Sequence, residues 1–430
     1  MQKKVAFFTL GCKLNFSESS TIVRQFLEEG YQRVDFEEKA DVYVINTCSV
    51  TEAANKKCRQ IIKKATKNSP DSFVAVVGCY AQLKPEEIAA IEGVDIILGT
   101  KDKFKIFQHI KNFESKKNGE IHSCNIDDVE EFDHAFSVGD RTRSFLKVQD
   151  GCNYKCSYCT IPLARGKSRN PSIESIVNQA NKIAKKGVKE IIITGINTGD
   201  FGRSTGEHFL VLLQNLENVN GIERFRISSI EPNLLTDEIL KFISSSPKFL
   251  PHFHIPLQAG SNKILALMRR RYTKEIFAER IAKVREFFNA PFLGIDVIVG
   301  FPQESYDDFM ETYNLLDTLQ VSFLHIFPYS ERPNTTASEM EGKISPSEMK
   351  QRSLMLHHLS ENKHKNYYLQ NIGKEAMVLF ENQNIKGKMV GFTENYIKVE
   401  STYNKAFINK IIKVSLQSIL ENGNMEGIFI

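Results

Sequence analysis

Residues 149–159 read QDGCNYKCSYC, and this stretch directly follows a short apolar run at 145–148. Its three cysteines, Cys152, Cys156 and Cys159, are separated by three and then two residues. Thiolates at this spacing can bind three irons of a four-iron cluster and leave the fourth iron open to another ligand. A structural zinc ion needs a fourth ligand, and no further cysteine or nearby histidine follows the stretch. The pattern therefore favours an iron–sulfur loop over a zinc loop completed from elsewhere in the chain.

Around this loop the sequence alternates predicted strands with predicted helices. Strands are expected at 145–148, 190–194, 224–228, 252–257, 292–299 and 321–327, and helices at 172–186, 273–289 and 306–319, among others. Six such β/α units predict a partial (β/α)6 barrel, which we assign to residues 141–370. The cysteine loop then lies at the carboxyl end of the first barrel strand, where barrels carry their active sites.

The first 112 residues also alternate strands with helices, in shorter units. Apolar runs occur at 5–10, 42–46, 73–78 and 94–98, with amphipathic segments at 16–30, 51–67 and 85–93. Buried strands that alternate with helices predict a parallel α/β domain of flavodoxin-like or Rossmann-like type. A polar stretch without clear periodicity, residues 113–140, is predicted to be a linker.

A second set of cysteines follows the strands of this first domain. Cys12, Cys48 and Cys79 come after the first, second and third apolar runs. The carboxyl ends of parallel strands meet at one edge of a sheet, so we expect these thiols to lie together and to bind a second cluster. Free cysteine is also a common buried residue, and we assign this role to Cys58. Cys124 is interpreted as an incidental thiol in the linker.

The last segment, residues 371–430, has short strands without helices. Strands are expected at 376–380, 388–392, 396–399, 406–414 and 427–430. They predict a small β-barrel. Its lysines and interleaved aromatic residues suit RNA, although alternating lysines also occur on ordinary solvated strands.

Composition sets the broad class of the chain. The 430 residues are 41% hydrophobic and 25% charged, with a net charge of +4 and eight cysteines. Eight cysteines in a reducing compartment favour metal or redox chemistry over disulfides. No apolar run approaches the roughly 18 residues of a membrane helix, so we expect a cytoplasmic protein with no membrane partner.

Seven stretches together resemble the radical S-adenosylmethionine (SAM) methylthiotransferase family. They are TLGCKLN (9–15), NTCSVT (46–51), GCYAQ (78–82), KVQDGC (147–152), RGKSR (165–169), HIPLQAGS (254–261) and DVIVGFPQE (296–304). The forms GCKLN and NTCSVT are most similar to the branch that acts on N6-threonylcarbamoyladenosine at position 37 of tRNA. The isopentenyladenosine branch tends towards GCQMN, and the branch that modifies a ribosomal protein favours GCxKN.

The resemblance implies two [4Fe-4S] clusters and a defined chemistry. SAM would bind the open iron of the cluster on Cys152, Cys156 and Cys159 and be cleaved to a 5′-deoxyadenosyl radical. The second cluster would carry the sulfur that is methylated and delivered as a methylthio group to C2 of the base. The implied partners are the anticodon stem-loop of tRNA, an electron donor such as flavodoxin or ferredoxin, and a sulfur source. The last segment resembles the RNA-binding TRAM domain of these enzymes.

By position on the barrel, we predict seven residues to contact SAM: Thr194, Gly195, Asn197, Ser228, Glu231, Val299 and Gly300. Gly300 would leave room for the adenine, although a tight turn before Pro302 explains it equally well. Two basic groups, Arg165/Lys167/Arg169 and Arg269/Arg270/Arg271, are expected to meet RNA phosphates.

Three other functions are compatible with parts of the pattern. One is a cobalamin-dependent radical SAM methyltransferase, whose partner domain is also α/β, but this would leave Cys12, Cys48 and Cys79 unexplained. Another is methylthiolation of an aspartate in a ribosomal protein. A third, without catalysis, is an RNA-binding protein with structural metal sites, which would hold zinc in place of iron and sulfide.

Overall fold

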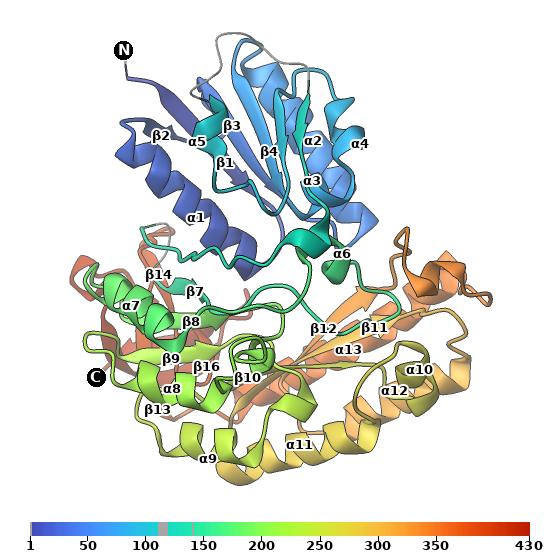
Figure 1. Ribbon diagram of the computed structural model, residues 1–430. Helices are drawn as coiled ribbons and strands as arrows, with labels where there is room; N and C mark the ends of the chain where they lie inside the picture. Colours follow the sequence, from blue (N-terminus) through green and yellow to red (C-terminus); the bar gives the residue numbers. More distant parts are fainter. Residues whose placement is uncertain (1, 111–118, 140–141) are drawn as a thin grey trace.

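The structure is a computed structural model that describes residues 2–110, 119–139 and 142–430. The chain forms three parts in sequence order, an α/β domain, a central barrel and a C-terminal barrel (Figure 1). The fold class predicted from the sequence is thus confirmed. Among the described residues, no helix is both long and apolar enough to cross a membrane.

The first part is a parallel six-stranded sheet in the order β2-β1-β3-β4-β5-β6. The order 2-1-3-4-5 within it is that of flavodoxin-like folds, in which ligands bind beyond the carboxyl ends of the strands. Apolar clusters line both faces of the sheet, and all six residues of β3 are buried. The strands are β1 (Lys4–Thr9), β2 (Gln32–Val34), β3 (Val42–Thr47), β4 (Phe73–Gly78), β5 (Ile96–Leu98) and β6 (Glu120–His122). The helices are α1 (Lys13–Glu28), α2 (Glu52–Asn68), α3 (Cys79–Leu83), α4 (Pro85–Ala89) and α5 (Ile106–Ile110).

One strand of this sheet comes from the segment predicted to be a linker. Residues Glu120–His122 pair in parallel with β5 and form β6, the edge strand. None of its three residues is buried, so the strand leaves no apolar pattern in the sequence. Strand β2, at the opposite edge, is equally short and was also not predicted.

The central part holds the six predicted parallel strands. They form two three-stranded sheets, β7-β8-β9 and β10-β11-β12, linked by bridges from Phe225 to Phe249 and from Ser229 to His254. Their shared core is the largest apolar cluster of the described chain. The strands are β7 (Ser144–Lys147), β8 (Glu190–Thr194), β9 (Arg224–Ile227), β10 (His252–Gln258), β11 (Phe292–Val299) and β12 (Phe323–Pro328). The helices are α6 (Ile161–Arg165), α7 (Ile173–Ala184), α8 (Phe209–Glu217), α9 (Asp237–Ser245), α10 (Asn262–Leu267), α11 (Lys274–Phe287), α12 (Tyr306–Thr318) and α13 (Pro346–Leu369).

The last part is a closed barrel in the order β13-β14-β15-β17-β16 around its own apolar core. The guanidinium of Arg226 on β9 donates to the carbonyls of Thr393 and Glu394, at 2.6 and 2.8 Å. These bonds fix the small barrel against the central one. Its strands are β13 (Glu375–Phe380), β14 (Lys388–Phe392), β15 (Lys398–Thr402), β16 (Ile411–Ile419) and β17 (Met425–Phe429).

Candidate active site

The first cysteine triplet lies on the loop between β7 and α6, as predicted. Its backbone path depends on Gly151, which has φ +68°, because an added Cβ would lie 2.0 Å from the carbonyl oxygen of Lys167. The amide of Tyr154 donates to Cys152 Sγ at 3.4 Å, and Arg270 Nη1 donates to Cys156 Sγ at 3.2 Å. Sulfur atoms held by such donors are prepared to carry negative charge.

Burial sets the protonation state of these thiols. It raises the pKa of Cys152 to about 11 and that of Cys159 to about 12. Burial also raises the pKa of Cys156, against the opposing charge of Arg270. The three groups are therefore neutral thiols near pH 7 until iron binds and displaces their protons. None of them forms a disulfide.

The second triplet lies at the carboxyl ends of three adjacent strands. Cys12 precedes α1 after β1, Cys48 follows β3, and Cys79 begins α3 after β4. Gly11, with φ +99°, allows the backbone before Cys12 to approach Cys48 closely, because an added Cβ would lie 2.8 Å from Cys48 Cβ. Burial raises the pKa of Cys48 to about 12, and the neighbouring charges of Cys79 and Cys12 act in the same direction. The structure thus brings the three predicted thiols together.

The spacing of the thiols bears on the zinc alternative. Thiolates on one zinc ion lie about 3.8 Å apart, given Zn–S bonds of about 2.3 Å in a tetrahedron. Among the described residues, one group of three potential metal ligands has all its ligand atoms within 4.8 Å of one another. It consists of His254, Asp296 and His325. Neither cysteine triplet is as compact as this group, and the binding of a larger cluster by each triplet stays a prediction.

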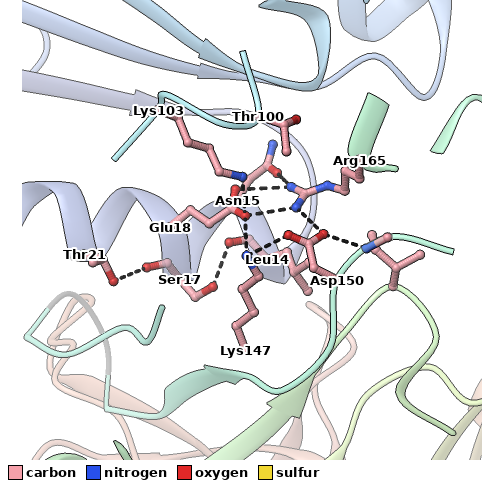
Figure 2. Close-up of polar contacts among 12 residues, drawn as sticks. Leu14, Asn15, Ser17, Glu18, Thr21, Thr100, Lys103, Lys147, Asp150 and Arg165 are labelled. Carbon is pink, nitrogen blue, oxygen red and sulfur yellow. Dashed lines mark hydrogen bonds and ion pairs between the residues drawn. The ribbon is translucent and has the colours of Figure 1, made fainter. Parts of the chain in front are cut away.

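A buried ion network joins the first domain to the central barrel (Figure 2). Glu18 on α1 accepts from Lys103 Nζ at 2.7 Å, Lys147 Nζ at 3.3 Å and Arg165 Nη1 at 2.9 Å. Asp150 accepts from the same Arg165 atom at 2.9 Å and pairs with Lys147 at 2.7 Å. Burial alone would raise the pKa of Glu18, but Arg165, Lys103 and Lys147 hold it well below its usual value. Both carboxylates, Glu18 and Asp150, are therefore ionised at neutral pH.

Asn15 connects this network to the second triplet. Its Oδ1 accepts from Arg165 Nη2 at 2.7 Å and lies 3.8 Å from Cys12 Sγ, within hydrogen-bond range for sulfur. Its Nδ2 donates to the carbonyls of Leu10 and Thr47 at the ends of β1 and β3. Since Arg165 ends the helix that follows the first triplet, one chain of polar contacts fixes both cysteine loops relative to each other.

This arrangement corrects part of the prediction for the basic groups. Arg165, Arg169 and Arg270 were expected to meet RNA phosphates, but their side chains are 1%, 8% and 4% exposed. Arg169 donates to the carbonyls of Glu131 and Arg165, and Arg270 pairs with Glu231. These three guanidiniums organise the site and cannot reach RNA. Contact with RNA phosphates stays a prediction for the other three members of these groups, Lys167, Arg269 and Arg271, which are exposed.

The predicted SAM residues on β8 and β9 lie near the first triplet in the fold. Gln149 Oε1 accepts from the amides of Ile196 and Asn197, both at 2.9 Å, and so fixes the loop that contains Gly195. Both polar side-chain atoms of Asn197 are buried without a hydrogen-bond partner among the described residues, as is Ser228 Oγ. Buried polar groups are rarely left unpaired in the absence of a ligand. Their number and type fit the amino and carboxylate groups of SAM.

The other predicted SAM residues show more ordinary surroundings. Thr194 Oγ1 donates to a carbonyl within β8, and Glu231 pairs with Arg270. Val299 is fully buried at the end of β11. Gly300 has φ +79°, and an added Cβ would lie 2.7 Å from Met349 Cγ on α13, so the turn and this packing already require glycine. The contact of these residues with SAM stays a prediction.

Beside Cys159 lies a cavity of about 260 Å³ that the two domains share. Val50 and Thr51, which follow Cys48, line one side, and Asp296 and Tyr329 of the barrel line another. The first domain is held here by Arg332, which donates to Ser49 Oγ at 3.0 Å and pairs with Glu52 at 3.1 Å. The cavity thus reaches from the surroundings of one triplet to those of the other.

Sequence reasoning missed a group of residues inside the barrel. His254 Nε2 and Asp296 Oδ1 are 2.6 Å apart, and the His254 and His325 rings are 4.8 Å apart between centroids. Burial lowers the pKa of His325 to about 4, so this ring is neutral at physiological pH. The stretches HIPLQAGS and DVIVGFPQE contain two of the three residues, but pairing of β10 with β11 is needed to bring them together.

Comparison with known proteins agrees with this site. Residues 4–99 match the family described as Uncharacterized protein family UPF0004, and residues 146–316 match the Radical SAM superfamily. The second match contains the whole first cysteine triplet together with Asn197 and Ser228, whose side chains are unpaired. The chain is therefore an enzyme of the radical SAM superfamily, a class that implies a [4Fe-4S] cluster and SAM.

Full-length relatives define the family more closely. The threonylcarbamoyladenosine tRNA methylthiotransferase MtaB of Bacillus subtilis is 43% identical over 425 residues, covering 96% of this chain and 93% of the relative. MtaB of Aquifex aeolicus is 39% identical, covering 96% and 99% of the two chains. A tRNA-2-methylthio-N(6)-dimethylallyladenosine synthase of Wolinella succinogenes is 32% identical, covering 97% of each. The chain belongs to the radical SAM methylthiotransferase family, which confirms the family predicted from its motifs.

Among solved structures, the radical SAM methyltransferase TsrM of Kitasatospora setae has a similar fold. The TM-score is 0.56 at 14% identity, and the match covers 78% of this chain and 77% of that chain. At this identity the likeness is one of fold alone.

Proposed function

We propose that this enzyme adds a methylthio group to C2 of N6-threonylcarbamoyladenosine at position 37 of tRNA, with SAM as both radical source and methyl donor. The observation that carries the proposal is the pair of free cysteine triplets, on two domains, joined by the contact from Arg165 to Asn15. The substrate is taken from the MtaB relatives of B. subtilis and A. aeolicus, which are 43% and 39% identical to this chain, against 32% for the dimethylallyladenosine synthase of W. succinogenes.

The first triplet, Cys152, Cys156 and Cys159, would hold the radical SAM cluster. When bound, this cluster supplies the electron that cleaves SAM. The protein's part is to position and shield the reactants. Asn197 and Ser228 offer unpaired hydrogen-bonding atoms to the polar end of SAM, and Arg270 donates to Cys156 and balances its charge.

The second triplet, Cys12, Cys48 and Cys79, would hold the second [4Fe-4S] cluster and the sulfur to be transferred. Three cysteine ligands leave one iron free for that sulfur. Asn15 lies beside Cys12, and its contact with Arg165 keeps this edge of the sheet turned towards the barrel. The cavity beside Cys159, lined also by Val50 and Thr51, is the proposed place for the target base.

The C-terminal barrel is the proposed tRNA contact. It exposes several lysines, and stacked aromatic residues lie beside them, as for Phe392 and Tyr396 at 4.9 Å between ring centroids. Lysines can pair with phosphates of the anticodon stem-loop while the aromatic rings accept unstacked bases. A flavodoxin or ferredoxin would supply electrons, and a separate sulfur source would renew the second cluster.

The test compares cluster content with activity on defined RNA. Anaerobically reconstituted wild type should hold two four-iron clusters, whereas Cys156→Ala and Cys48→Ala should each lose one. Cys124→Ala is the matched control, because this cysteine lies outside both triplets. We expect methylthio product by mass spectrometry from wild type and the control alone, on tRNA that carries threonylcarbamoyladenosine.

Two results would contradict the proposal in different ways. Zinc in place of iron and sulfide would exclude the radical chemistry. Two intact clusters, with product from dimethylallyladenosine tRNA or a ribosomal protein and none from threonylcarbamoyladenosine tRNA, would leave the enzyme class standing and overturn the substrate.

A further inference from the structure

A second and larger cavity, about 630 Å³, lies where all three parts of the chain meet. Ligand pockets are typically about 300–1,000 Å³, so this space is large enough for a substituent of the target base. The first domain contributes Lys13, the central barrel contributes strands β10, β11 and β12, and the C-terminal barrel contributes Tyr396 and its neighbours. The residues on which the argument rests are Lys13, His252, His254, His325, Tyr396 and Lys398.

Lys13 is the unusual member of this lining. It is the first residue of α1 and directly follows Cys12, and its ammonium makes no hydrogen bond or ion pair with the residues that the structure describes. The neighbouring cations differ in this respect. Arg143 pairs with Glu381 at 3.0 Å, and Arg226 pairs with Glu190 at 2.8 Å. A half-buried ammonium without a counter-ion is costly unless a ligand supplies one.

The lining favours an anion as that ligand. It includes two lysines, Lys13 and Lys398, and no aspartate or glutamate among its described residues. The carboxylate of Asp296 is not part of this lining, and it is already hydrogen-bonded to His254. The ring atom His252 Nδ1 is buried without a partner and belongs to the same cavity. A ligand there would need a negative group for the lysine and a polar group for the imidazole.

We propose that this cavity binds the N6 substituent of the target base and that Lys13 pairs with its carboxylate. The inference rests on the proposed function, because a threonylcarbamoyl group carries one free carboxylate together with a hydroxyl and a urea-like linkage. Tyr396 and the ring of His252, 4.3 Å apart between centroids, give the cavity an aromatic wall for the remainder of the group. Lys13 is thus a specificity-determining residue.

The same contact explains discrimination between related substrates. A dimethylallyl group is neutral and apolar, so it would bury the ammonium of Lys13 without a counter-charge. Because Lys13 follows Cys12 in the chain, an anchored carboxylate also fixes the base relative to the second triplet. Recognition of the substituent and placement of the base therefore depend on one residue.

The test measures binding of anticodon stem-loop RNAs to the enzyme with both clusters reconstituted. One RNA carries threonylcarbamoyladenosine, a second carries its neutral methyl ester, and a third carries unmodified adenosine. Wild type should bind the acid at least tenfold more tightly than the ester, whereas Lys13→Met should bind the two equally. Lys13→Arg should restore the preference. Lys64→Met, which removes an exposed lysine of the first domain outside this cavity, should leave the preference unchanged.

Each other outcome overturns the inference. If Lys13→Met keeps the preference for the acid, the carboxylate binds elsewhere. If Lys13→Met weakens binding of the unmodified RNA as much as binding of the acid, Lys13 contacts a phosphate. If it abolishes SAM cleavage in the absence of RNA, Lys13 serves SAM. A wild type that makes product from threonylcarbamoyladenosine tRNA but ignores the ester change contradicts this inference alone. A wild type that makes no such product contradicts the proposed function and the inference with it.

Discussion

Arg270 illustrates how a single residue can adjust the cluster site. Its guanidinium donates to Cys156 Sγ and pairs with Glu231, and its side chain is almost fully buried. Burial raises the pKa of Glu231, which Arg270 opposes, so this carboxylate depends on the guanidinium for its charge. A positive charge beside a cluster stabilises the reduced state, which carries one more negative charge.

We expect Arg270→Met to lower the rate of 5′-deoxyadenosine formation about 10- to 100-fold, the usual range for partners of metal ligands. The reduction potential of the cluster should become more negative, because the stabilising charge is removed. A redox titration followed by electron paramagnetic resonance measures the potential. Arg269→Met is the control, since Arg269 is an exposed member of the same basic group. Equal potentials in wild type and Arg270→Met would contradict the assignment.

The residues of the site differ in how far the sequence can predict them. The cysteines are predictable because each triplet follows buried strands, and strand ends of a parallel sheet share one edge. Glu18 and Arg165 are not, because their pairing joins a helix of the first domain to a helix of the barrel. A charged side chain with a distant buried partner looks like any surface charge in the sequence, which is why Arg165 was assigned to RNA.

At the scale of elements, helix α12 shows local sequence determining local structure. Ser305 and Asp308 form a capping box, with the Asp308 amide donating to Ser305 Oγ at 3.1 Å and the Ser305 amide donating to Asp308 Oδ2 at 3.0 Å. Asp308 also accepts from Lys263 Nζ at 2.7 Å and Ser261 Oγ at 2.8 Å. Burial alone would raise the pKa of Asp308, but these hydrogen bonds lower it from 3.8 to about 2.

We expect Asp308→Asn to lower the free energy of unfolding by about 1–2 kcal/mol at pH 6. The folded pKa lies below the unfolded one, so the unfolded state binds more protons between pH 4 and pH 2. The stabilisation is therefore complete above about pH 4 and is lost as the pH falls towards 2. Chemical denaturation of both proteins across this range measures the difference. Asp307→Asn, in the same turn but outside the capping box, should change the free energy of unfolding little. If the difference in free energy of unfolding between wild type and Asp308→Asn is the same at every pH, the charge of Asp308 does not stabilise the helix.

Elements with a buried face were predictable, and short edge elements were not. All six strands of the central barrel lie within a few residues of their predicted positions, because each contains buried apolar side chains that face the core. Strands β2 and β6 have three residues each and no buried ones, so their pairing depends on the sheet they extend. The C-terminal strands were found for the same reason as those of the barrel, with ends displaced at the turns.

For the whole molecule, the ion network around Glu18 determines how the first domain meets the barrel. Removing one partner from a buried charge cluster leaves the others without compensation. We expect Arg165→Met to destabilise the protein by about 3–5 kcal/mol, because Glu18 and Asp150 lose their shared guanidinium. Urea denaturation under anaerobic conditions measures the loss. Lys64→Met, which breaks the exposed pair with Glu37, should cost less than about 1 kcal/mol.

Beyond stability, Arg165→Met should separate the two half-reactions. In the proposed function, SAM cleavage would need the barrel alone, whereas methylthio transfer would need both triplets at a fixed distance. The ratio of 5′-deoxyadenosine to methylthio product should therefore rise in this variant at temperatures where it remains folded. An unchanged ratio would mean that other contacts, such as that of Arg332 with Ser49 and Glu52, hold the domains in register.

The buried network also limits how these enzymes can be recombined. A hybrid that joined the first domain of another protein to this barrel would enclose Lys147 and Arg165 at the junction, and only a carboxylate at the position of Glu18 could neutralise them together with Asp150. The amide of Asn15 would have to accompany it, since it is the remaining partner of the guanidinium. Functional chimaeras should therefore be found only among parent proteins that share the side chains of this network. The buried charges at the junction restrict which first domains can be combined with this barrel.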